Sequence, residues 1–375
     1  MIKITNEKEE RKTKEKERLI MMKIDVTKTA NPKAKPDPAN VPFGVAFTDH
    51  MFLMDYNENG GWHNPRIVPY GDIHLNPGAL VFHYGAEVFE GLKAYRTPDG
   101  QVQMFRPDAN ISRMNDSAER LCLPKLDEEM ALEALKAFVS VEKDWVPEPY
   151  GTSLYLRPFM FGTDPDLSLH GIHHATFMII ACPVGSYYKS GLQPVELLIE
   201  MDDVRAVRGG TGYAKCGGNY AAATRAGEKA AEKGYSQVLW VDGVERKYVE
   251  EGGGMNVMFV WNGKLVTPEL NGSILPGVTR RSILAMAQSW GMETEERKIS
   301  VEELMEACKN GEVQEAFMCG TAAVVTPIGG FAYGDEKIVV NNNQIGEMTQ
   351  KIYDELTGIQ WGLKEDTFGW TVKVD

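Results

Sequence analysis

Apolar and polar positions change period along the chain, which predicts a mixture of strands and helices. Short runs of branched and aromatic residues at 153–156, 176–180 and 195–199 predict strands, because such side chains favour extended backbone. Apolar residues recur at helical spacing over 131–139, and an alanine-rich segment over about 219–233 predicts a second helix. We therefore expect the α/β fold class, in the mixed α+β sense.

Turn and cap signals mark the ends of several elements. Asp99-Gly100 and Asn262-Gly263 each lie between β-rich runs and predict tight hairpins. Ser300 with Glu303 forms a capping-box pattern, which predicts the start of a helix that ends near Gly311.

The chain of 375 residues is long enough for two domains, each with its own core. A charged tail and a stretch rich in proline and lysine predict a disordered tail and linker over residues 1–40. The pattern breaks again near Pro183. We expect a small N-terminal domain over 41–184, an interdomain loop over 185–194, and a larger β-rich domain with flanking helices over 195–375.

Charge and composition exclude several partners. The net charge of −13 argues against nucleic acid or an anionic membrane as a partner, and no apolar run is long enough to span a bilayer. Five scattered cysteines favour a reducing, cytoplasmic setting. His170, His173 and His174 have a spacing that metal ligands use, but the adjacent Gly171 favours a loop, and we expect no metal site.

Lys215 lies in a tract of small residues over 209–220, the strongest chemical signal in the chain. Small neighbours let the backbone approach a bulky ligand, and a lysine shielded from water can act as a nucleophile. Taken alone, such a tract is also typical of a surface turn with a solvated lysine.

Other segments supply what a lysine-bound aldehyde cofactor, pyridoxal 5′-phosphate, requires. The run 275–280 opens a helix whose free amides favour phosphate, and Thr321 lies in a second small turn. Glu250 or Glu251 offers a carboxylate for the pyridine nitrogen, although such a pair is also common in a solvated turn. Tyr220 offers a donor to the phenolic oxygen, or packs in the core.

From about Phe43 to Thr367 the chain resembles the branched-chain amino acid aminotransferases, which are fold-type-IV enzymes that use pyridoxal phosphate. The resemblance runs through ordered segments along nearly the whole chain, at 43–51, 89–95, 152–158, 209–220, 251–256 and 275–280. It implies a two-domain fold-type-IV architecture.

The resemblance implies a role for each residue of a site. Lys215 is then the base that forms an imine with the cofactor, Glu251 the partner of the pyridine nitrogen, and Tyr220 the donor to the phenolic oxygen. The implied phosphate ligands are Arg113, Val278, Thr279 and Thr321. The implied substrate pocket contains Phe43, Tyr84, Tyr155, Arg157, Tyr187, Thr321, Ala322 and Leu167.

Further details follow from the same resemblance. Arg157 is expected to orient Tyr84, and the turn at Thr321 and Ala322 to hold the α-carboxylate of the substrate. Leu167 matches a position that the family supplies from the neighbouring subunit, which implies a homodimer. Gly254 departs from the family, because many relatives have threonine there.

The implied reaction is reversible amino transfer from leucine, isoleucine or valine to 2-oxoglutarate, giving the 2-oxo acid and glutamate. Two other fold-type-IV activities are alternatives, D-amino acid aminotransferase and aminodeoxychorismate lyase. A third alternative is a non-catalytic protein whose glycine-rich loop binds an anion.

Overall fold

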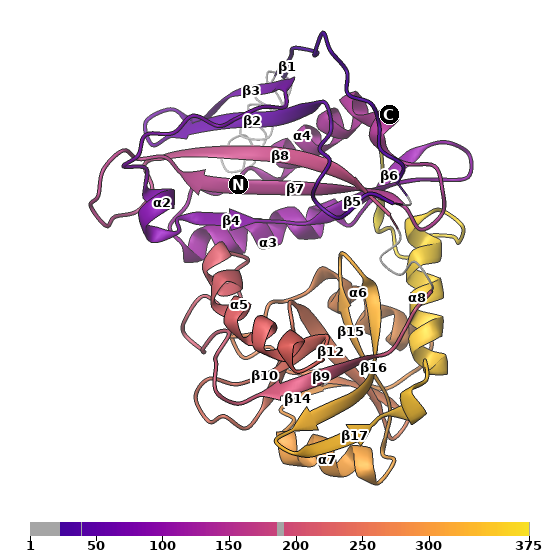
Figure 1. Ribbon diagram of the computed structural model, residues 1–375. Coiled ribbons are helices and arrows are strands. Elements are labelled where there is room, and N and C mark those ends of the chain that lie inside the picture. Colours follow the sequence, from indigo (N-terminus) through magenta and orange to yellow (C-terminus); the bar gives the residue numbers. More distant parts are fainter. Residues whose placement is uncertain (1–22, 39, 186–190, 375) are drawn as a thin grey trace, which may run out of the picture.

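A computed structural model describes residues 23–38, 40–185 and 191–374, which form two nine-stranded sheets with helices packed against them (Figure 1). The expected mixed α/β class is confirmed. The predicted strands and helices lie where the apolar pattern placed them.

The first sheet has the strand order β1-β3-β2-β8-β7-β5-β6-β18, with β4 paired to β7. Its strands are β1 (Asp25–Val26), β2 (His50–Asn57), β3 (Gly61–Pro69), β4 (Glu87–Phe89), β5 (Leu92–Arg96), β6 (Val102–Phe105), β7 (Ser153–Gly162), β8 (His174–Val184) and β18 (Thr371–Val374). Short α2 (Leu80–Tyr84) and the 3-10 turn η1 (Lys143–Trp145) connect parts of this region.

Helices α3 (Pro107–Arg120) and α4 (Glu128–Val141) bury their apolar sides against this sheet. Met114 of α3 and Leu135 and Phe138 of α4 join sheet residues such as Phe52 in one core. The helical spacing of apolar residues over 131–139 therefore predicted the buried side of α4 correctly.

The second sheet has the strand order β11-β10-β9-β16-β15-β12-β13-β14, with β17 paired to β16. A further pairing of β11 with β12 closes six of these strands into a ring. Its strands are β9 (Val195–Glu200), β10 (Gln237–Val241), β11 (Val249–Gly252), β12 (Met255–Trp261), β13 (Lys264–Pro268), β14 (Thr294–Arg297), β15 (Val313–Gly320), β16 (Val324–Tyr333) and β17 (Glu336–Val339).

The helices of this region are α5 (Gly217–Glu232), α6 (Val278–Ser289), α7 (Val301–Lys309) and α8 (Glu347–Gln360), with the 3-10 turn η2 (Asn341–Asn343) before α8. The capping box of Ser300 and Glu303 at α7 is confirmed. Both predicted hairpins form, joining β5 to β6 and β12 to β13. In the second hairpin both Asn262 and Gly263 have positive φ, as a tight turn of this kind requires.

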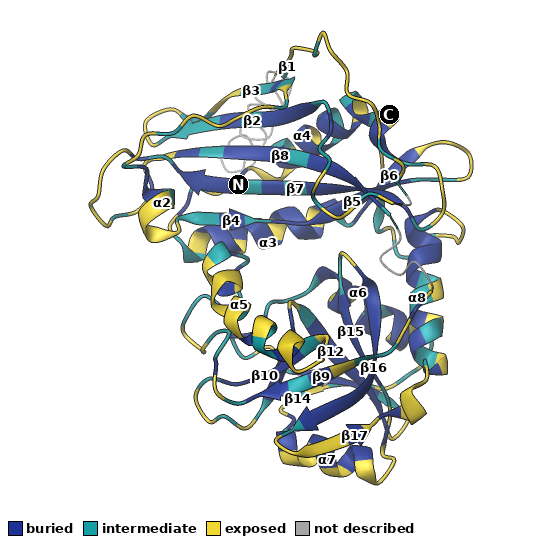
Figure 2. Ribbon diagram, in the orientation of Figure 1, coloured by how far each residue is buried: buried dark blue, intermediate teal, exposed yellow. Residues whose placement is uncertain are grey.

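A third core joins the two regions. Tyr95 and Phe105 of the first sheet pack with Ile352 and Leu356 of α8, and the Tyr95 and Trp361 rings are 4.7 Å apart. Figure 2 shows that the strands of both sheets are largely buried, whereas α5 keeps an exposed side. The two sheets are thus held together by apolar packing as well as by the chain connection.

The expected domain division stays a prediction, but the structure differs from it at two segments, one at each end of the described chain. Residues 371–374 belong to the first sheet, because β18 pairs with β6 and Val374 is buried there. The end of the expected tail is also ordered, because β1 pairs with β3 and Lys33 Nζ donates to the Thr48 carbonyl at 2.9 Å. Residues 1–22 and half of the expected interdomain loop, 186–190, lie outside the described residues.

His170 and His173 lie outside helices, as the adjacent glycine predicted, and their rings stack 4.7 Å apart. Among the described residues, no group of three acidic, histidine or cysteine side chains is arranged to hold a metal ion. None of the described helices combines the length and apolar character needed to cross a bilayer.

Candidate active site

A cavity between the two sheets collects most of the residues that the sequence singled out. It has a volume of about 180 Å³, many times the space that one water molecule needs. The predicted site residues that line it are Lys215, Tyr220, Glu251, Arg113, Val278, Thr279, Thr321, Ala322, Tyr155 and Arg157. A neighbouring cavity shares Tyr220, Glu251, Gly254 and Leu275, so the two are adjoining parts of one site.

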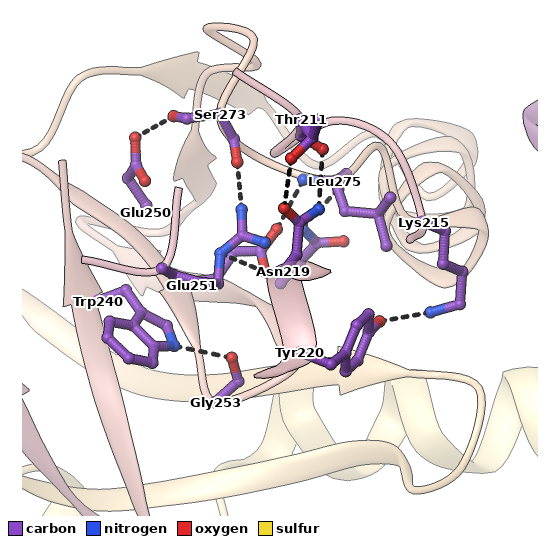
Figure 3. A network of polar contacts seen from close by, with 12 residues as sticks. Thr211, Lys215, Asn219, Tyr220, Trp240, Glu250, Glu251, Gly253, Ser273 and Leu275 are labelled. Atoms are coloured by element: carbon purple, nitrogen blue, oxygen red, sulfur yellow. Dashed lines mark hydrogen bonds and ion pairs between the residues drawn. The ribbon is translucent and has the colours of Figure 1, made fainter. Parts of the chain in front are cut away.

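Lys215 is held by its backbone immediately before α5. Its N–H donates to Ser117 Oγ at 2.9 Å, and its carbonyl accepts from the Phe89 N–H at 3.0 Å. Its Nζ atom lies 2.6 Å from Tyr220 Oη (Figure 3). The same atom lies 4.8 Å from the centre of the Phe89 ring. The amine is therefore directed into the cavity, with a hydroxyl from the start of α5 as its partner.

The glycine-rich tract is a packed loop rather than the solvated turn that remained an alternative. Asn219 Nδ2 donates to the carbonyls of Thr211 and Ala214 at 2.8 and 2.9 Å, which ties the tract to the first turn of α5. A Cβ atom at Gly212 would lie 2.2 Å from the Ser273 carbonyl oxygen. Glycine is needed there because the backbone passes directly against the neighbouring segment.

Glu251 is a buried carboxylate on β11, only 3% exposed. Its Oε1 accepts from the Leu275 N–H at 2.7 Å, and Arg205 Nε lies 3.5 Å from its Oε2. Burial raises the pKa of Glu251 above its usual value, while Arg205 opposes the change. The group is placed to share a proton with a basic nitrogen in the cavity.

Glu250 belongs to a different surface, because successive side chains of a strand point to opposite faces. It accepts a hydrogen bond from Ser273 Oγ (Figure 3). It also accepts one from Asn271 Nδ2, and it is buried. The solvated turn considered for this pair is therefore wrong, since both carboxylates lie on a buried strand.

Two features make the part of the cavity that is lined by Arg113 and Val278 suitable for binding an anion. Helix α6 begins at Val278, and its N-cap Gly277 makes no side-chain cap hydrogen bond, so the first N–H groups of the helix are available. Arg113 on α3 brings a buried guanidinium, whose Nη1 donates to the Pro276 carbonyl at 3.2 Å. Together they combine a positive charge with a helix N-terminus.

Sequence reasoning missed the groups that hold these residues in place. Glu90 accepts from Arg113 Nε and Nη2, each at 2.8 Å, in a buried two-point ion pair. Arg205 lies beside Glu251, and Asn256 Nδ2 donates to the Leu275 carbonyl at 2.9 Å, which holds the segment before α6. Glu90 and Asn256 lie within segments that carried the family resemblance. The sequence signal that could have identified them was a charged or amide residue within an apolar run.

Three predicted substrate residues, Phe43, Tyr84 and Leu167, are not in the cavity lining. Tyr187 is outside the described residues. Phe43 lies just beyond the cavity lining, with its ring 4.9 Å from that of Tyr155. Tyr84 Oη donates to the Leu167 carbonyl at 2.6 Å, and both side chains are exposed.

Among the described residues of one chain, no hydrogen bond joins Arg157 to Tyr84, and the expectation that Arg157 orients Tyr84 stays a prediction. Arg157 Nη2 donates to Tyr155 Oη at 3.1 Å instead, and its guanidinium lies 4.7 Å from the centre of the Phe89 ring. The reason is that Arg157 and Tyr155 share one face of β7, whereas Tyr84 lies on α2 beside the loop of Leu167.

The residues of the cavity fit pyridoxal 5′-phosphate. An amine with a tyrosine hydroxyl lies on one wall, a buried carboxylate can face a ring nitrogen, and an arginine with a helix N-terminus can face a phosphate. Each requirement is met by a different element of the fold.

Comparison with known proteins agrees with this chemistry. The model of the amino-transferase class IV family matches residues 87–330. The chain belongs to the class IV aminotransferase family. The match spans the first-sheet strands beside the cavity, the lysine loop, Glu251 and the turn at Thr321.

Its relatives in this family include two Bacillus subtilis proteins. The chain is 52% identical over 351 residues to branched-chain-amino-acid aminotransferase 2, covering 94% of this chain and 97% of the relative. It is 53% identical over 352 residues to branched-chain-amino-acid transaminase 1, covering 94% and 99%.

Solved structures of the family have the same fold. The branched-chain amino acid aminotransferase of Escherichia coli superimposes with a TM-score of 0.73 at 28% identity, covering 87% of this chain and 99% of that one. The T.th. branched-chain amino acid aminotransferase with pyridoxamine 5′-phosphate gives a TM-score of 0.72 at 25% identity, covering 87% and 98%. The fold-type-IV architecture is therefore confirmed.

Proposed function

We propose that this chain is a branched-chain-amino-acid transaminase. It transfers the amino group of L-leucine, L-isoleucine or L-valine to 2-oxoglutarate, with pyridoxal 5′-phosphate as cofactor. The observation that carries the proposal is a single cavity. Its lining includes Lys215 with Tyr220, the buried Glu251, and Arg113. Relatives at about 52% identity over most of the chain support the substrate class.

Each residue of the cavity has a part in this chemistry. When bound, the pyridoxal group supplies an electron sink for negative charge at the substrate α-carbon. Lys215 Nζ would hold the cofactor and would be the base that carries the α-proton. Tyr220 Oη, 2.6 Å from that nitrogen, would orient it, and Glu251 would hold a proton at the ring nitrogen. Arg113 and the first N–H groups of α6 would bind the phosphate.

The other wall of the cavity selects the substrate. Tyr155, Phe89 and nearby Phe43 supply apolar surface for a branched side chain, whose burial is favourable by about 1.5–3 kcal/mol. Thr321 and Ala322 form a tight turn at the edge of the same space and bind the α-carboxylate.

The purified enzyme should convert L-leucine and 2-oxoglutarate to glutamate and show a visible absorption band from its cofactor. Lys215→Ala should lose that band and at least about a thousandfold in kcat, because both the anchor and the proton carrier are removed. D-alanine and aminodeoxychorismate, assayed in parallel, should react poorly. Turnover of either in place of L-leucine would favour the corresponding alternative activity.

We also propose that the enzyme is a homodimer in which Tyr84 and Leu167 complete the partner's site. Both are absent from the cavity lining within one chain, and both are exposed, with Tyr84 Oη hydrogen-bonded to the Leu167 carbonyl. Phe82 and Leu169, each two positions along the chain from one of them, are exposed as well, and the exposed fractions of Phe82, Tyr84, Leu167 and Leu169 are 61, 47, 63 and 82%. Exposed apolar residues on two touching segments favour a protein interface.

We infer a cytoplasmic location from the cysteines. All five are free, and four of them are buried, as in proteins kept in a reducing compartment. Cell fractionation should find the enzyme with the cytoplasmic proteins, and its recovery from an exported fraction would contradict the inference.

A further inference from the structure

Lys93 is a buried lysine next to the cavity that the reaction described above does not use. It lies on β5, is 6% exposed, and pairs in register with Tyr155 on β7. Directly paired residues of neighbouring strands project from the same face of a sheet. Lys93 therefore points, like Tyr155, toward the second sheet and the substrate side of the cavity.

Within the part of the chain that the structure describes, the ammonium group of Lys93 has one hydrogen-bond partner and no counter-charge. Its Nζ atom donates to the Ala322 carbonyl at 2.7 Å, and no carboxylate of the described residues is paired with it. Burial lowers the pKa of Lys93 to about 8. A buried cation without an anion is costly, so its retention behind a ligand cavity suggests that the ligand brings the missing charge.

The group lies behind the turn of Thr321 and Ala322. A second bond, from Thr321 Oγ1 to the Gly91 carbonyl at 3.2 Å, also ties this turn to the first sheet. Val324, which follows the turn, has φ of +64°, a conformation that a β-branched residue rarely adopts. A backbone under such strain keeps its shape only when its surroundings hold it, and Lys93 supplies one of the two links.

We propose that Lys93 is a positioning residue for substrate recognition, which orients the turn at Ala322 and supplies the positive charge that favours an α-carboxylate bound there. The proposal rests on the function proposed above, in which this turn binds the α-carboxylate. Lys93 acts through the turn, because it is not among the residues that line the cavity.

A pair of ligands that differ only in charge tests this role. The probes are 4-methylpentanoate and its neutral amide, 4-methylpentanamide, bound to the cofactor-loaded enzyme and followed by calorimetry. Lys93→Met should weaken binding of the acid about tenfold or more, the size expected for losing one nearby charge. Binding of the amide should change less than about twofold.

Two further variants separate charge from structure. Lys93→Gln keeps an N–H donor but no charge, so it should also weaken binding of the acid while sparing the amide. It also serves if Lys93→Met does not fold. Lys136→Met removes a lysine of α4 whose ion pair is with Glu133, and it should change neither affinity.

If Lys93→Met weakens binding of the acid and of the amide equally, the proposed role of Lys93 is wrong. It is also wrong if both Lys93→Met and Lys93→Gln bind the acid as tightly as the wild type does. Neither result would affect the proposed function if the wild-type enzyme still converts L-leucine. A wild-type enzyme that binds the acid but does not turn over L-leucine would instead contradict the proposed function.

Discussion

Gly253 and Gly254 form the turn between β11 and β12, immediately after Gly252 at the end of β11. Gly253 has φ of +55°, and a Cβ there would lie 2.3 Å from Gln237 Oε1. Gly254 has no such backbone constraint, and its Cβ would meet only Tyr220 Cε1, at 3.8 Å. The backbone therefore does not require glycine at position 254. Having glycine there, where many relatives have threonine, leaves space beside Tyr220.

Alanine at these two positions should have different effects. Gly253→Ala should lower the free energy of unfolding by about 1–3 kcal/mol, because the side chain forces strain in the left-handed region. Gly254→Ala should change it by less than about 0.5 kcal/mol. Urea unfolding followed by circular dichroism measures both, and equal destabilisation would contradict the different demands of the two positions.

Among the elements, the segment between β4 and β5 is joined to α3 by the ion pair of Glu90 and Arg113. Burial by itself raises the pKa of the Glu90 carboxyl, but Arg113 and Asn110 outweigh it, so the pKa lies below its usual value. The pair orients the arginine that the phosphate would meet, and it links a strand segment to a helix across the first core.

Glu90→Gln should lower the free energy of unfolding by about 3 kcal/mol at pH 7, because it leaves Arg113 buried without its carboxylate. Because the pKa of Glu90 is lowered in the folded protein, this carboxyl binds a proton more readily in the unfolded chain. The ion pair therefore stabilises the fold above the usual carboxyl pKa of about 4.3. This stabilisation is lost as the pH falls through the lower pKa that Glu90 has in the folded protein.

The difference between wild type and Glu90→Gln in urea unfolding should therefore shrink below about pH 4. Glu133→Gln is the matched control, because Glu133 is exposed and pairs only with Lys136 on the surface of α4. It should leave the free energy of unfolding almost unchanged. A difference for Glu90→Gln that stays constant down to low pH would contradict the ionised pair.

For the molecule as a whole, the proposed dimer predicts that two defective subunits can restore one working site. Lys215→Ala removes the lysine of its own site, and Leu167→Asp damages the pocket of its partner. A mixed dimer of the two would contain one site with an intact lysine and an intact Leu167.

Refolding the two variants together should therefore recover activity that neither variant has alone. Each mixed dimer has one intact site, so its activity should approach half that of a wild-type dimer. Light scattering should give about twice the subunit mass of 41.8 kDa. Tyr150→Phe, which changes an exposed aromatic side chain elsewhere, is a control for nonspecific effects. A monomer with full activity would contradict the shared site.

Local pattern was sufficient for many of the elements, and together with the family resemblance it named candidate residues for the site. Helical spacing over 131–139, the hairpin at Asn262-Gly263 and the capping box at Ser300 depend on interactions within a few residues, so the sequence determined them. Lys215 and the helix start at Val278 were also identified by residue type, whereas the choice of Glu251 over Glu250 came from the family resemblance.

Only the tertiary structure decided how distant segments meet. The pairing of Glu90 with Arg113 and the contact of Lys93 with Ala322 join residues 23 and 229 positions apart along the chain. Strand β18 likewise returns from the end of the chain to pair with β6 in the first sheet. The geometry of these contacts depends on burial and on how two sheets pack, and a one-dimensional pattern carries neither. A buried charge such as Lys93 has meaning only once its surroundings are known, because burial and neighbouring groups determine its energetic cost.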